Sequence, residues 1–231
     1  MGLKDDLTKD VKAIFAEEWE SRDGQVVPSD DDLKLGNDAV KLDGTVLYAD
    51  LADSTKLVDG YKPHFAAEVY KAFLRCAAKI IRTEGGSITA YDGDRVMAVF
   101  IGDSKNTSAA RCALKINWAV KNIIRPALNV QYPKSSYVLK HVVGIDTSSL
   151  WVARVGIRGS NDLVWVGRAA NYAARLCALP DDYPIWITKS VYDKLRDEAK
   201  VSKGKDMWEE RLWTPMGGIS IYRSTWSWAL T

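Results

Sequence analysis

The order of strand-like and helical segments is the strongest constraint on the fold of this chain. Residues 44–50, GTVLYAD, carry the β-branched and aromatic residues typical of a strand. Apolar residues at helical spacing follow over residues 55–82, and Glu-Gly-Gly ends that pattern. Two short strand-like runs, residues 87–91 and 95–100, flank an Asp-Gly-Asp turn signal and predict a hairpin. The main domain therefore begins as β-α-β-β.

The remaining segments continue this alternation. Helices are predicted over residues 108–124, 168–179 and 189–199, and strands over residues 136–146, 149–157, 162–167, 184–188 and 219–226. A β-α-β-β-α-β order with additions is typical of an α+β sandwich of the ferredoxin-like kind. We therefore expect an α+β fold in which helices cover one face of the sheet.

The N-terminal region differs in character from the rest. Apolar residues recur at helical spacing over residues 3–20 and predict an amphipathic helix. Residues 21–38 are polar and hold Gly, Pro and three consecutive aspartates, which predicts a linker. The aspartates lack the alternating ligand pattern of a calcium loop, so a solvated loop is the better interpretation. We divide the chain into a helix and polar linker, residues 1–42, and a main domain, residues 43–231.

Composition excludes several classes of protein. The 32 basic and 30 acidic residues give a formal charge of +2, which argues against a nucleic-acid partner. No run approaches the roughly 18 apolar residues that span a bilayer, and the N-terminus lacks the apolar run of a signal peptide. Three cysteines lie far apart with no CxxC spacing, which favours buried free thiols. We expect a soluble, cytoplasmic protein with no membrane partner.

The first candidate site lies in LYADLADST. Asp50 ends a predicted strand and projects into a loop, where a carboxylate is free to bind metal. The next residues open a helix, and free N–H groups at a helix start attract phosphate. The proposed phosphate cradle consists of Ala52, Asp53, Ser54 and Thr55. Asp53 or Ser54 as a simple helix cap is the alternative interpretation.

A second aspartate belongs with the first. Asp94 lies at the hairpin turn in YDGDRVMAVF, and the first strand of a ferredoxin-like sheet is central and close to that hairpin. Two carboxylates could then converge on one or two hard cations, which prefer oxygen ligands. Such a pair of magnesium ions can activate a hydroxyl group and hold a triphosphate.

The third element is VGRAANYAARL. Asn171 and Arg175 are four residues apart on a predicted helix, so they share one face. The planar guanidinium of Arg175 suits phosphate, and Asn171 can orient a ribose hydroxyl. A solvated helix face without a function remains the alternative for both residues.

Together, the three motifs resemble the catalytic core of class III adenylate and guanylate cyclases over roughly residues 43 to 223. The spacing of Gly167, Asn171 and Arg175 is the most specific part of the match. The resemblance implies that Asp50 and Asp94 hold two Mg²⁺ or Mn²⁺ ions per site. It further implies that the Leu51 carbonyl is an additional ligand, and that Asn171 and Arg175 stabilise the transition state.

The same resemblance implies a head-to-tail homodimer with shared active sites. In that family the metal aspartates come from one chain, and the Asn/Arg pair comes from the other. A basic residue in the last third of the chain contacts the triphosphate. Arg211 is our candidate for it here, with Lys203 and Lys205 as alternatives.

Departures from the family pattern concern the base. Purine cyclases place a Lys four residues before the second metal aspartate, where this chain has Ala90. Adenylate cyclases place Asp or Thr three residues before the motif glycine, where this chain has Val164. Loss of both partners of a buried base removes purine discrimination. The base-pocket candidates are Tyr48, Ala90, Tyr91, Val164 and Trp165, with Arg95 at lower weight.

With this altered pocket, the chain resembles the bacterial pyrimidine cyclases of anti-phage signalling. That resemblance implies a nucleoside triphosphate substrate, UTP in preference to CTP, and a cyclic UMP product read by a separate effector protein. Alternatives are a cytidylate cyclase, a purine cyclase with an atypical pocket, and a catalytically dead nucleotide sensor. A polymerase-like nucleotidyltransferase is disfavoured by the NxxxR helix.

Overall fold

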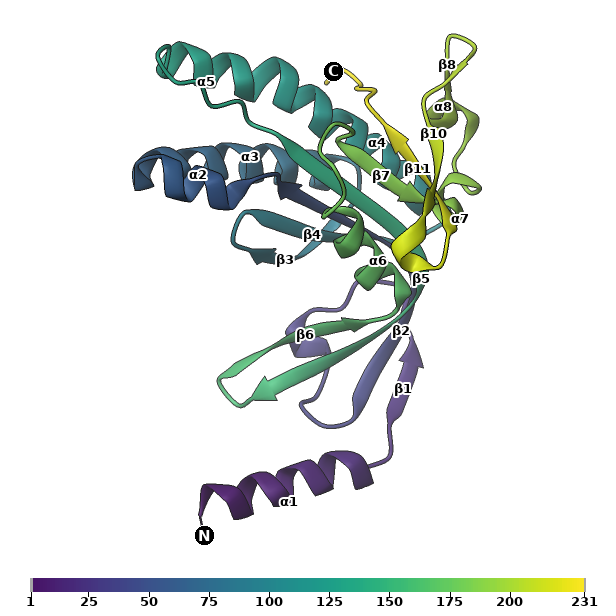
Figure 1. Ribbon diagram of the computed structural model, residues 1–231. Helices are drawn as coiled ribbons and strands as arrows, with labels where there is room; N and C mark the ends of the chain where they lie inside the picture. The colour runs from purple at the N-terminus through teal and green to yellow at the C-terminus, as the bar shows by residue number, and fades with distance from the viewer. Residues whose placement is uncertain (1, 231) are drawn as a thin grey trace.

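The computed structural model describes residues 2–230 and is built around one mixed nine-stranded sheet (Figure 1). The strand order is β10-β11-β7-β5-β2-β4-β3, while β1 pairs with β2 and β6 pairs with β5. The strands are β1 (Glu20–Asp23), β2 (Asp38–Leu51), β3 (Ser87–Asp92), β4 (Arg95–Phe100), β5 (His141–Ile157), β6 (Ser160–Val166), β7 (Ile185–Thr188), β10 (Glu209–Trp213) and β11 (Ile219–Ser224). The expected α+β class is confirmed.

Strand β2 is central and separates two apolar clusters. Leu47 and Ala49 belong to the larger cluster on one face, whereas Val46 and Tyr48 contact the cluster on the other. Side chains alternate between the faces of a strand, so Asp50 lies on the same face as Tyr48. The two antiparallel neighbours of β2 are β4 and β5, which places the hairpin of β3 and β4 beside the end of β2.

A layer of helices covers the face of the larger cluster. Its helices are α2 (Ser54–Gly60), α3 (Pro63–Thr83), α4 (Lys105–Ala119) and α5 (Arg125–Gln131), with a π-helical turn (Val120–Ile124) before α5. The single helix expected over residues 55–82 is divided, because Pro63 starts a new helix at its first position. Within residues 2–230, no helix has the length and apolar character needed to cross a membrane.

Helix α6 (Arg168–Leu176) lies on the opposite face, which corrects the expectation that helices cover only one face. Its small residues Ala169 and Ala173 pack against β2 and β5. Gly144 on β5 permits this close approach: a Cβ atom there would lie 2.2 Å from the Ala173 carbonyl oxygen. Because these residues are small, the backbone of α6 lies directly on the sheet.

A projecting arm extends from the sheet and carries α1 (Leu3–Ala16) at its end (Figure 1). The arm consists of β1, the first half of β2, the second half of β5, β6 and α1. The expected linker contains strand β1 and a 3-10 turn (Asp30–Asp32), because residues 20–23 pair in parallel with β2. Strand β2 already begins at Asp38, and the domain division at residue 42 remains a prediction.

The C-terminal third departs most from the sequence pattern. The helix expected over residues 189–199 is two short helices, α7 (Lys189–Tyr192) and α8 (Asp197–Lys200). The backbone is extended at Arg196, whose N–H donates to Thr107 Oγ1 at 3.0 Å and whose guanidinium donates to Ser104. Strands β8 (Val201–Ser202), β9 (Lys205–Asp206) and β10 were not expected. The two strands expected over residues 136–146 and 149–157 form a single strand, β5. This strand begins at His141, so residues 136–140 lie outside it.

Candidate active site

Asp50 and Asp94 lie close enough to influence each other electrostatically. Asp50 is the penultimate residue of β2, and Asp94 follows Gly93, whose positive φ of 60° allows the hairpin turn. Burial, together with the negative charge of Asp94, raises the pKa of Asp50 to about 6. The structure therefore brings together the two aspartates that the sequence pairs.

The chemistry of this aspartate pair fits a divalent cation. The Oδ2 atom of Asp94 is buried and has no hydrogen-bond partner among residues 2–230. A buried carboxylate oxygen without a partner is costly, and a cation removes that cost. Across the described chain no group of three or more acidic, His or Cys side chains converges, so Asp50, Asp94 and the Leu51 carbonyl would leave coordination positions for substrate oxygens and water.

The turn after β2 only partly matches the expected phosphate cradle. The N–H of Ala52 donates to the Lys140 carbonyl at 3.0 Å, so it is already bonded, contrary to the expectation of a free donor. Asp53 has φ of 58° and makes no capping hydrogen bond, and its carboxylate pairs with Lys56 at 2.9 Å. The donors that remain for the predicted cradle are the N–H groups of Asp53, Ser54 and Thr55 at the start of α2, where N–H groups have no partner within the helix.

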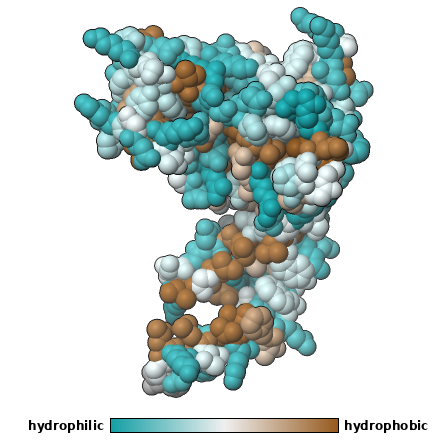
Figure 2. All heavy atoms as spheres, viewed as in Figure 1, coloured by the Kyte–Doolittle hydropathy of each residue, from teal (hydrophilic) through white to brown (hydrophobic). Residues whose placement is uncertain are grey.

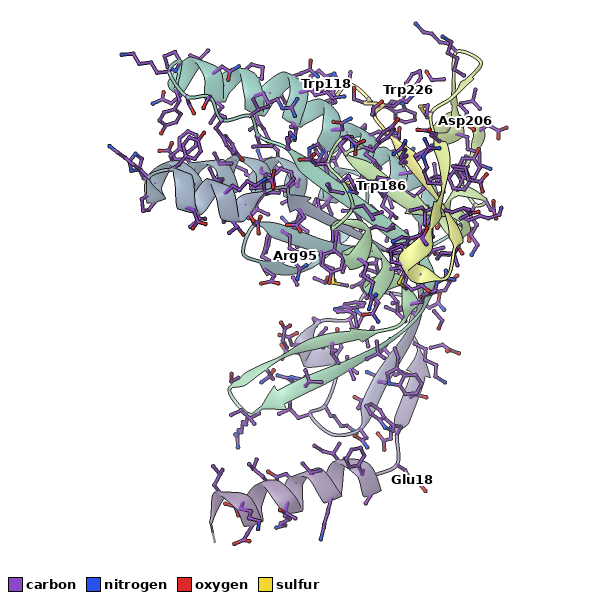
Figure 3. All side chains as sticks on the ribbon, in the orientation of Figure 1. Glu18, Arg95, Trp118, Trp186, Asp206 and Trp226 are labelled. Atoms are coloured by element: carbon purple, nitrogen blue, oxygen red, sulfur yellow. The ribbon has the colours of Figure 1, made fainter. Side chains whose placement is uncertain are left out.

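Arg95 joins the site from the neighbouring hairpin (Figure 3). Its Nη2 atom donates to Asp92 at 2.8 Å, and its guanidinium lies over the Tyr48 ring, 5.5 Å from the centroid. The positive charge of Arg95 partly offsets the rise in the pKa of Asp50. Arg95 therefore connects the proposed metal site with the Tyr48 ring.

The base-pocket candidates divide into two groups. Tyr48 and Ala90 pack against the apolar cluster that contains Trp165, and the Nε1 atom of Trp165 is buried without a partner in residues 2–230. Tyr91 lies on the other face, beside α3, because a β-bulge between Ile88 and Ala90 precedes it and side chains alternate.

Val164 is also separated from the main group of base-pocket candidates. It neighbours Trp165 on β6 and therefore points to the opposite face, where it lines an apolar cavity of the arm with Trp19 and Trp151. Within one chain, Tyr91 and Val164 do not lie beside Tyr48, Ala90 and Trp165, so their base-pocket roles remain predictions that depend on a second chain.

Asn171 and Arg175 point away from the body of their own chain. Both are exposed on α6, whereas Ala169, Ala173 and Leu176 are buried against the sheet. Asn171 donates weakly to the Gly167 carbonyl at 3.4 Å, and Arg175 contacts the Met216 sulfur at 3.3 Å. In the described part of the chain neither has a hydrogen bond or ion pair with the aspartates, which leaves this face open to a second molecule.

Arg211 lies far from the aspartates in strand order. It belongs to β10, and β11, β7 and β5 separate that strand from β2. Its guanidinium pairs with Glu209 on the same strand. Within one chain it does not join the proposed triphosphate site, so its role remains a prediction that depends on a second chain.

Sequence reasoning missed one buried ion pair beneath α6. Asp146 on β5 is fully buried and is paired with Arg168, the first residue of α6. The available signal was an aspartate at the end of the apolar run HVVGID, because a buried carboxylate must be paired. That signal indicates a partner without identifying it.

Two full-length relatives share more than half of the sequence. The chain is 58% identical over 231 residues to a uridylate cyclase from Xanthomonas perforans, with 100% of both chains covered. It is 56% identical over 232 residues to a uridylate cyclase from Burkholderia cepacia, again with 100% of both chains covered. No protein-family model matches the sequence. The similarity therefore extends over the whole chain, including both the arm and the sheet.

A solved structure shows the same fold at much lower sequence identity. The guanylyl cyclase Cya2 has a TM-score of 0.69 and 19% identity to this chain, with 81% of this chain and 94% of that chain covered. At this level of identity the likeness concerns the arrangement of the sheet and helices only. It supports the class III cyclase fold that the sequence analysis expected.

Proposed function

The chain belongs to the uridylate cyclase family, with the fold of class III nucleotidyl cyclases, and from this premise we propose that it converts UTP to 3′,5′-cyclic UMP and pyrophosphate. The observation that carries this proposal is the pair formed by Asp50 and Asp94, with a raised pKa on one carboxyl and an unpartnered buried oxygen on the other. The exposed Asn171 and Arg175 supply a complementary half-site.

In this reaction the ribose 3′ hydroxyl releases its proton to water, and the 3′ oxygen attacks the α-phosphorus. The bond from the α-phosphorus to the bridging oxygen breaks, and pyrophosphate leaves with that oxygen. Two Mg²⁺ or Mn²⁺ ions held by Asp50, Asp94 and the Leu51 carbonyl would supply Lewis-acid stabilisation when bound. Asp53, Ser54 and Thr55 would orient the terminal phosphates through their backbone N–H groups.

The remaining groups would come from a second copy of the chain. Arg175 would offset the negative charge that grows on the α-phosphate, and Asn171 would align the ribose hydroxyl. Both side chains are exposed on α6 and have only weak contacts in their own chain, which supports a homodimer with shared sites.

Recognition of the base is proposed to rest on Arg95 and Tyr48. Uracil presents two carbonyl acceptors, which suit the N–H donors of a guanidinium, and its single ring can stack on Tyr48. Asp92 fixes the guanidinium beside that ring. Ala90 stands where purine cyclases have a lysine, so the pocket has no long side chain at this position.

We further propose a cytoplasmic second-messenger role in phage defence, with cyclic UMP read by a separate effector. This role rests on the resemblance to anti-phage pyrimidine cyclases. The three unpaired cysteines are consistent with a reducing compartment.

The test is to incubate the purified protein with Mn²⁺ and each of ATP, GTP, CTP and UTP, and to identify products by chromatography and mass. Cyclic UMP from UTP is the expected product, and Asp50→Asn or Asp94→Asn should abolish it. Asp59→Asn, an exposed acidic residue on α2 outside the site, is the matched control and should retain full turnover. Cyclic CMP, or a cyclic purine product, would overturn the assignment of UTP, and tight binding without turnover would indicate a sensor.

A further inference from the structure

Helix α6 is anchored at its first residue by a buried ion pair. The Asp146 carboxylate is fully buried and accepts hydrogen bonds from Arg168 Nε at 3.0 Å and Nη2 at 3.2 Å. Thr188 donates its hydroxyl to the same carboxylate. Two parallel bonds from one guanidinium define direction as well as distance, because the fork and the carboxylate are both planar.

Further bonds tie the same end of α6 to β5 and α7. Arg168 Nη2 also donates to the Thr147 carbonyl at 2.7 Å and to Ser190 Oγ at 3.1 Å. The N–H of Ala169 donates to Ser148 Oγ at 3.0 Å, which satisfies one of the free donors at the helix start. The N-terminal end of α6 is therefore held from several directions.

The opposite end of α6 has its own anchor on the strand that carries Asp50. The buried Cys177 thiol donates to the Tyr48 carbonyl at 3.4 Å and lies 3.6 Å from the Val142 carbonyl oxygen. With both ends held on the sheet, the exposed face bearing Asn171 and Arg175 has one orientation. Arg175 is seven residues beyond Arg168, about 10 Å along the helix axis, so a small tilt at Arg168 displaces it.

We propose that Arg168, locked by Asp146, is a positioning residue that sets the orientation of α6 and thereby places Asn171 and Arg175 in the active site of a second copy of the chain. A direct phosphate-binding role for Arg168 is disfavoured, because its Nε and Nη2 atoms are committed to Asp146, Thr147 and Ser190. This inference rests on the proposed cyclase function and its shared sites.

The first test compares Arg168→Lys with Arg111→Lys. Arg111, on α4 in the opposite helix layer, also pairs with a buried carboxylate, Glu84, which Lys115 pairs with as well. It is therefore the control for replacing an arginine that is paired with a buried carboxylate. Arg168→Lys keeps the charge and loses the bidentate geometry. We expect turnover of UTP to fall roughly 10- to 100-fold with little change in KM, as for groups displaced by about 1 Å from a reacting centre. Arg111→Lys should lower stability without this loss of turnover.

Mixed dimers show which half of the site Arg168 serves. Asp50→Asn and Arg175→Ala chains, mixed in equal amounts, should regain about a quarter of wild-type activity, because half of the dimers are mixed and each has one intact site. Arg168→Lys should reach the same level when mixed with Asp50→Asn. It should not be rescued by Arg175→Ala, because both defects then lie in the α6 half. Equal rescue by both partners would overturn the proposal.

Hydrogen exchange provides a readout that does not need activity. The amides of α6 should exchange faster in Arg168→Lys than in the wild type, and unchanged α6 exchange would refute the positioning role. If Arg168→Lys does not fold, Thr188→Val removes one donor to Asp146 while the ion pair stays, and the same measurements apply. Lack of UTP turnover in the wild type would reject the proposed function. The exchange rates of the α6 amides would still show whether Arg168 holds the helix on the sheet.

Discussion

Arg95 shows at the residue scale how the chain could replace purine recognition. The guanidinium is held by Asp92 and lies over Tyr48, so it would present donors beside a stacked base. Arg95→Met keeps the length of the side chain and removes every donor. We expect UTP turnover at low substrate to fall roughly 10- to 100-fold, as when a polar partner of a buried base is lost, and the preference for UTP over CTP to narrow.

Competition kinetics with UTP and CTP would measure that change in preference. Arg158→Met, at the exposed tip of the hairpin between β5 and β6, is the control and should behave like the wild type. A preference for UTP that survives Arg95→Met unchanged would show that another residue reads the base.

A second prediction at this scale concerns His141, a buried histidine at the start of β5. Burial, together with the positive charges of Arg125 and Lys121, lowers the pKa of His141 to about 3. The unfolded state therefore binds more protons, so the contribution of His141 to stability is complete above pH 6.5 and is lost progressively as the pH falls toward 3. At pH 5 the loss is about 2 kcal/mol.

Denaturant unfolding between pH 7.5 and pH 5 would test this linkage. His141→Leu removes the titrating group, so its stability should fall less over that range than the stability of the wild type. His64→Gln, at an exposed position near the start of α3, should keep the full wild-type dependence. Equal pH dependence in His141→Leu and the wild type would contradict the prediction.

At the scale of the element, Gly144 determines how closely α6 approaches the sheet. A Cβ atom at Gly144 would lie 2.2 Å from the Ala173 carbonyl and 2.8 Å from Leu176 Cβ, so Gly144→Ala must push the helix outward. We expect a loss of stability of roughly 1–3 kcal/mol, as for other overpacked cores, together with reduced turnover. Thermal unfolding and product formation measure the two effects.

Gly60→Ala is the appropriate control for that substitution. Gly60 is the last residue of α2, and a Cβ atom there meets nothing within 4 Å. This variant should retain both stability and turnover. If Gly144→Ala also retains both, the close contact between α6 and β5 does not matter for function.

Periodicity in the sequence predicted most elements near the aspartates but not their faces. Helix α3 and the hairpin of β3 and β4 follow from local patterns. The pairing of Asp50 with Asp94 follows from the expected ferredoxin-like order, which places the first strand beside that hairpin. The position of Tyr91 depends on a β-bulge, a one-residue shift that no local pattern signals. The close approach of α6 to the sheet depends on Gly144, far away in the sequence. Contacts between distant segments thus decide which side chains share a pocket.

On the scale of the whole molecule, one chain exposes apolar surface that a lone protein rarely leaves open. No residue of α1 is buried, and its apolar side chains Phe15 and Leu3 are 86% and 74% exposed. Further apolar residues gather along the arm (Figure 2). Such surface marks an interaction site more often than a free face. It is consistent with the open face of α6 and with a proposed site that needs a second copy.

The last prediction follows from a site divided between two chains: turnover should belong to the dimer alone. Because the proposed site combines Asp50 and Asp94 of one copy with Arg175 of the other, specific activity should fall on dilution in step with the fraction of dimer. Mass photometry and initial rates on the same dilution series measure both quantities. Activity that stays constant while the mass falls to that of one chain would mean that a single chain completes the site, and would overturn both the shared site and the directional rescue expected for Arg168.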